Sequence, residues 1–106
     1  ALVTLNDSVY ISLARHFAGW MMEKSPASVD QQISAGYERM LYRSIAAAKL
    51  QTLKNLYIKA LTVYQKDTEA RKEMLGEELK GKTPEAAALV VVANAMLNLD
   101  EVVMKN

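Results

Sequence analysis

The sequence contains no cysteine among its 106 residues. A chain without cysteine cannot form a disulfide, a thiolate metal site, a cysteine nucleophile or a covalent CxxCH attachment to haem. Proline and glycine are also scarce, with two and four residues. Because these two residues punctuate turn-rich β folds, their scarcity favours long helices.

The sequence also lacks a long apolar run and a block of like charge. Its longest apolar stretch, residues 86–93, is far shorter than the roughly twenty residues that span a bilayer, so no transmembrane segment is predicted. Thirteen basic and twelve acidic residues are interspersed and give a net charge of +1. Domains that bind nucleic acid usually concentrate basic charge on one face, so we expect no nucleic-acid partner.

The first part of the chain predicts an amphipathic helix. Apolar residues recur at helical spacing over about residues 8–24, after a start signal in Asn6-Asp7-Ser8. The opposite face carries Arg15, His16 and Glu23. No other histidine or cysteine lies at metal-ligand spacing, so we expect His16 to be solvated and not a catalyst or a haem ligand.

Two further helices are predicted in the middle of the chain. Ser28 and Gln31 form a capping-box pattern, and Gly36 on the apolar stripe that follows suits close helix–helix approach. The next helix is the longest, and we favour a break or bend in it near residues 66–68. One continuous helix through residue 80 is the open alternative. Charges of alternating sign in residues 66–82 indicate a solvated helix face.

The last helix has the clearest signals. Thr83 is a suitable N-cap and Pro84 stands at the first helical position, where its missing N–H costs nothing. The residues that follow are apolar on almost every side through Leu97, which predicts a central helix covered by its neighbours. The whole chain therefore predicts one all-α, bundle-like domain, residues 1–106, of four to five antiparallel helices with this helix at the centre.

The most suggestive polar residues form the segment Asn98-Leu99-Asp100-Glu101. Adjacent side chains on a helix diverge by about 100°, so Asp100 and Glu101 would need Asn98 and a further group, such as Asp7, to build a metal or acid–base site. Alternatively, Asn98 ends the helix in an αL-type cap and Asp100 caps a short turn. We favour the caps and predict no catalytic, cofactor-binding or metal-binding residue in this chain.

Asparagines at the end of the last helix predict a structural polar cluster. Asn94 and Asn98 lie four residues apart on one face of an apolar helix, where a buried amide needs a hydrogen-bond partner. The turn at residues 6–7 is the expected partner and would join the two ends of the chain. The predicted cluster consists of Asn6, Asp7, Asn94, Asn98, Asp100 and Glu101.

Three segments of the chain resemble one known family. Residues 2–10 (LVTLNDSVY) resemble its pattern L-x-x-L-N-D-P-x-F, residues 37–43 are similar to a-F-x-x-x-L-x-R, and residues 93–101 (ANAMLNLDE) are very close to its terminal A-N-x-L-L-N-L-D-E-F. The chain thus resembles the C-terminal part of the planctomycete surface domain family, a bacterial domain of unknown function. It departs from the family at Ser8, at Val102 and at Lys49, which stands where the family has a glutamate.

The resemblance implies a setting. Members of this family occur in large, multidomain, exported bacterial proteins that often carry a cytochrome c domain. We therefore expect a C-terminal fragment of a larger periplasmic or cell-surface protein, with upstream domains of the same protein as partners. Any haem would lie in a companion domain, and no cofactor is expected in this chain. The oligomeric state is open.

The function expected from these observations is that of a non-catalytic helical structural or interaction module. One alternative is a part-enzyme, in which Asp7, Asp100 or Glu101 joins a site that upstream residues complete. Another is an accessory domain to a cytochrome c electron-transfer domain.

Overall fold

The computed structural model describes residues 8–99, and within this range the chain forms five α-helices and no strand. The helices are α1 (Ser8–Lys24), α2 (Val29–Leu41), α3 (Ala47–Lys66), α4 (Thr68–Leu75) and α5 (Pro84–Leu97). The predicted all-α, bundle-like fold is confirmed. The predicted break near residues 66–68 is also confirmed, because α3 and α4 are separate helices. Within the described range, no helix is long and apolar enough to cross a bilayer.

Short side chains begin three of these helices, two of them at capping positions that the sequence indicated and the third at the predicted break. Ser28, Asp67 and Thr83 each accept a hydrogen bond from the backbone N–H three residues later, at 3.2, 3.0 and 3.2 Å. Such an N-cap contributes about 1 kcal/mol, because it satisfies a backbone N–H that has no partner inside the helix. These caps set where α2, α4 and α5 begin.

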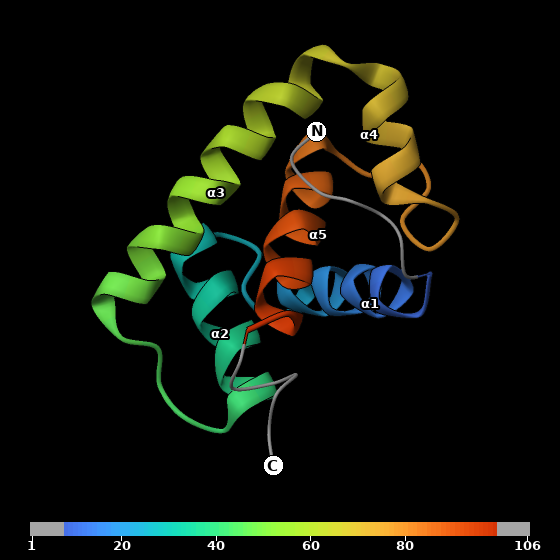
Figure 1. Cartoon of the computed structure of the whole chain (residues 1–106). Helices are drawn as coiled ribbons and strands as arrows, with labels where there is room; N and C mark the ends of the chain where they lie inside the picture. Colours follow the sequence, from blue (N-terminus) through green and yellow to red (C-terminus); the bar gives the residue numbers. More distant parts are fainter. Residues whose placement is uncertain (1–7, 100–106) are drawn as a thin grey trace.

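Helix α5 forms the centre of the molecule. Figure 1 shows it (orange to red) with the other helices around it, and it contacts each of α1, α2, α3 and α4. Its residues 86–93, together with Met96 and Leu97, are no more than 4% exposed. Burial of each larger side chain contributes about 1.5–3 kcal/mol, so a helix that is apolar on every side is most stable in this place. The predicted central helix is confirmed.

Small residues let α1 approach its neighbours closely. In Figure 1, α1 lies across α5, and its Ala14 and Ala18 are fully buried. A Cβ atom on Gly36 of α2 would lie 2.7 Å from Sδ and 3.0 Å from Cγ of the buried Met21. Any side chain at position 36 would force Met21 to shift, so Gly36 permits the close approach of α1 and α2 that its position on the apolar stripe predicted.

The segment after α4 is a series of turns over residues 76–81 and not helix. Leu79 is buried from this turn at 6% exposure, and both Gly76 and Gly81 have positive φ. The prediction that residues 66–82 form a solvated helix face is therefore wrong for part of the segment. Leu79 packs into the core from this turn and so places the neighbouring Glu78 against α1.

Candidate functional site

The polar contacts between α1 and the end of α4 centre on Arg15. Its Nε donates a hydrogen bond to the carbonyl oxygen of Met74 at 2.9 Å, and its Nη2 donates to that of Glu73 at 3.0 Å. Its Nη1 lies 3.3 Å from Oε1 of Glu78. The two carbonyl groups belong to the last turn of α4 and lack a donor within the helix. Arg15 therefore satisfies the end of one helix from the side of another.

Glu78 connects the turn to α1 a second time. Its Oε2 accepts a hydrogen bond of 2.8 Å from the hydroxyl of Ser12. This hydrogen bond, a hydrogen bond with the backbone of Glu78 and the positive charge of Arg15 together hold the pKa of Glu78 below its usual value of 4.5. A general acid needs the opposite shift, because it must keep its proton near neutral pH. Glu78 is thus a fixed anion that binds Arg15 and Ser12.

Gly76 makes room for the guanidinium group. Its φ of 62° and ψ of −161° lie in a backbone region that is essentially restricted to glycine. A Cβ atom there would lie 2.5 Å from Cζ of Arg15. Glycine is therefore needed at this position both for the turn and for the contact. The sequence placed Arg15 on the polar face of the first helix, and the turn after α4 covers this part of that face.

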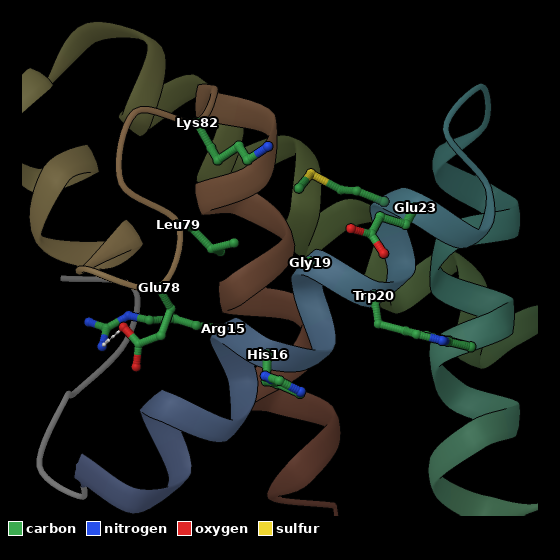
Figure 2. Close-up of a pocket in the computed structure, with 9 residues that line it drawn as sticks. Arg15, His16, Gly19, Trp20, Glu23, Glu78, Leu79 and Lys82 are labelled. Atoms are coloured by element: carbon green, nitrogen blue, oxygen red, sulfur yellow. Dashed lines mark hydrogen bonds and ion pairs between the residues drawn. The ribbon is translucent and has the colours of Figure 1, made fainter.

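A cavity of about 450 Å³ adjoins these contacts (Figure 2). His16 and Glu23 on its rim are exposed, so the prediction of a solvated histidine is confirmed. Trp20 points away from Glu78 and toward α2, where the guanidinium carbon of Arg39 lies 4.6 Å from the centre of its ring. The cavity is lined by Arg15, His16, Gly19, Trp20, Met22, Glu23, Glu78, Leu79 and Lys82.

The polar contacts of this site join α1 to the end of α4 and to the turn that follows it. Arg15 and Glu78 form hydrogen bonds with each other, with Ser12 and with the end of α4. Among residues 8–99, no three histidine, aspartate or glutamate side chains gather as a metal ion would require. What the arrangement does is to hold the turn after α4 against α1.

The predicted polar cluster lies only partly in the described range. Asn6, Asp7, Asp100 and Glu101 lie outside it, so their association stays a prediction. Asn98 is exposed, and its Nδ2 donates to the carbonyl oxygen of Asn94 in the same helix at 2.7 Å. The expectation that both amides are buried is wrong for Asn98, because its side chain bonds back to its own helix.

The predicted αL-type cap at Asn98 is also wrong. This residue has φ −98° and ψ 7°, and its backbone N–H bonds to the carbonyl of Ala95 at 3.1 Å. The N–H of Leu99 bonds to Met96 at 3.2 Å in the same way. The helix thus ends by tightening into bonds between residues three apart, which need no left-handed residue.

The contact between Arg15 and Glu78 was missed from the sequence. The two residues are 63 positions apart, and no local pattern links them. The available signal was the pair of glycines that bracket residues 77–80, which marks a turn and not a helix face.

Comparison of the chain with protein-family models, with curated proteins and with solved structures finds no match.

Proposed function

We propose that this chain is a non-catalytic helical module that packs against other parts of a larger protein. The observation that carries the proposal is the use of Arg15, whose guanidinium holds two carbonyl groups of α4 and the carboxylate of Glu78. This arrangement of charged groups holds the turn after α4 against α1 and so stabilises the fold. Its purpose is to fix the surface that the module presents.

Tyr42 supports an external contact. It follows α2 with a φ of 58°, in the left-handed region, and its exposed fraction is 89%. A non-glycine residue in this region costs on the order of 1–2 kcal/mol of backbone strain. Here the left-handed conformation ends α2, where the backbone N–H of Tyr42 bonds to the carbonyl of Glu38, and the aromatic ring lies in solvent, where a partner can cover it.

The setting follows from the resemblance of residues 2–10, 37–43 and 93–101 to the planctomycete surface domain family. It supports a multidomain, exported bacterial protein, in the periplasm or at the cell surface, with its upstream domains as partners. A haem group of that protein would belong to a companion domain.

The test uses the full-length parent protein with a photo-crosslinking amino acid at position 42. We expect crosslinks, mapped by mass spectrometry, to upstream domains of the same polypeptide. The control is the same amino acid at Lys66, which is exposed at the end of α3. Crosslinks at position 42 that stay within residues 1–106, or that match those at position 66, would refute the proposal.

The part-enzyme alternative has a separate test in the same protein. Asp7→Asn, Asp100→Asn and Glu101→Gln remove the three acids without changing their size. We expect any reaction of the parent to keep its rate in all three variants. A large loss of turnover in a variant that still folds would show instead that the chain contributes to an active site.

A further inference from the structure

A second cavity, of about 600 Å³, lies beside the last turns of α4 and the turn that follows. Its volume is within the range of roughly 300–1,000 Å³ that is usual for sites of small molecules. In Figure 1 this region is the short helix α4 with the loop that leads from it to α5. Neither Arg15 nor Glu78 lines it, and Lys82 lines both cavities.

The side chains that line this cavity are strongly positive. Arg71, Lys72, Lys80 and Lys82 face a single acid, Glu77. The rest of the sequence has nine basic and eleven acidic residues, a net charge of −2, so the positive charge of the chain is concentrated here. Within residues 8–99, none of the three lysines forms an ion pair.

The cavity also has an apolar part, formed by a buried side chain. Leu75, which is 3% exposed, lies in its wall, and the carbon chains of the lysines add apolar surface. Arg71 is half-buried and held in place, because its Nη1 donates to the carbonyl oxygen of Tyr64 at 3.1 Å. Arg15 also fixes the end of α4, where the turn begins, through its hydrogen bonds to the carbonyl groups of Glu73 and Met74. Because the backbone that carries the charged side chains is already fixed, binding a ligand does not have to order it, and this lowers the entropic cost of binding.

We propose that this cavity binds a small organic dianion of the phosphate monoester class. Cationic groups that line a concave site focus the electrostatic potential and raise the local concentration of anions. Lysine ammonium groups are common ligands of phosphate, and three of them exceed what a single negative charge would balance. The apolar wall favours a phosphate that carries an organic group. This proposal does not depend on the packing role of the module.

The test is a titration of the 106-residue chain with phenyl phosphate, followed by the chemical shifts of its backbone amides. We expect saturation, with the largest shifts in residues 71–82. Inorganic phosphate should bind at least threefold more weakly, because it lacks the apolar part, and benzyl alcohol should not bind. Equal affinity for inorganic phosphate would overturn the organic part of the proposal, and the absence of saturation would overturn the site.

Matched variants separate this cavity from general attraction of anions. Lys80→Gln/Lys82→Gln removes two exposed cavity lysines, and Lys59→Gln/Lys66→Gln removes two exposed lysines of α3 with the same loss of charge. We expect the first pair to weaken binding of phenyl phosphate at least fivefold and the second less than twofold. Circular dichroism checks that both variants keep their helices. An equal loss in the two variants would mean that the lysines attract anions only as a solvated surface.

Discussion

Helices α5 and α4 are neighbours held in place by different forces. α5 is buried along most of its length and is covered by every other helix, so apolar area fixes its position. α4 has only eight residues, of which Met74 and Leu75 are buried. A helix of this length is not stable alone in water. It is held by contacts at its two ends, namely the cap from Asp67, the turn at Gly76 and the hydrogen bonds from Arg15.

The largest effect is expected in α5. Leu89→Ala removes a side chain that is 1% exposed and leaves a cavity at the centre of the molecule, so the free energy of unfolding should fall by about 2–5 kcal/mol. Ile58→Ala on α3, where the side chain is 50% exposed, should cost about 1 kcal/mol or less. Urea denaturation measures both. Equal losses would contradict a core that is organised around α5.

A smaller effect is expected where α4 ends. Gly76→Ala places a Cβ in a glycine-only conformation and against Arg15, so it should cost about 1–3 kcal/mol. Gly81→Ala is the control, because Gly81 also has positive φ but a Cβ there would meet no atom within 4 Å. The difference between the two variants should shrink when Arg15 is replaced by alanine. If it stays the same, the clash with Arg15 is not its cause.

The next effect separates the two helices directly. Arg15→Lys keeps the charge but removes the planar fork that bonds two carbonyl groups at once, and should cost about 1 kcal/mol. Hydrogen exchange should accelerate for the amides of α4 and remain slow for those of α5. The control is His16→Gln, which changes an exposed neighbour on the same helix. Equal acceleration in both helices would show that α4 opens only when the whole domain unfolds.

The smallest effect concerns pH. The pKa of Glu78 is lower in the folded protein than its usual 4.5, so the stability gained from its ionised form is present above pH 4.5. It is lost as the pH falls below 4.5 and through the lowered pKa of the folded state. Glu78→Gln should therefore be less stable than the parent chain at pH 6, with the gap closing below pH 4.5. A gap that does not change with pH would argue against a lowered pKa.

Features that depend on neighbours in the sequence could be predicted from it. The N-caps at Ser28 and Thr83, the break at residue 67 and the apolar surface of α5 are each encoded within a few residues. Gly36 was also predicted to lie at a close approach, because it stands on an apolar stripe.

Features that depend on the path of the chain could not be predicted. Arg15 meets α4 only because the turn at residues 76–81 buries Leu79 and brings Glu78 over α1. The end of α5 was misjudged for another reason. Asparagine is common in left-handed caps, but Asn98 bonds to the carbonyl of Asn94 and the helix closes with a tighter turn. The cavity lysines lie before, within and after the turn at residues 76–81, and the alternating charges of the sequence did not reveal that they line one cavity.

The central position of α5 has a consequence for synthesis. The ribosome makes α1 to α4 before α5, at about 5–20 residues per second. For some seconds, therefore, the helix against which their apolar faces pack is absent. Short amphipathic helices are marginal without such packing. The nascent chain therefore gains a stable core only when residue 97 has left the exit tunnel, and until then its exposed apolar faces are targets for chaperones and proteases.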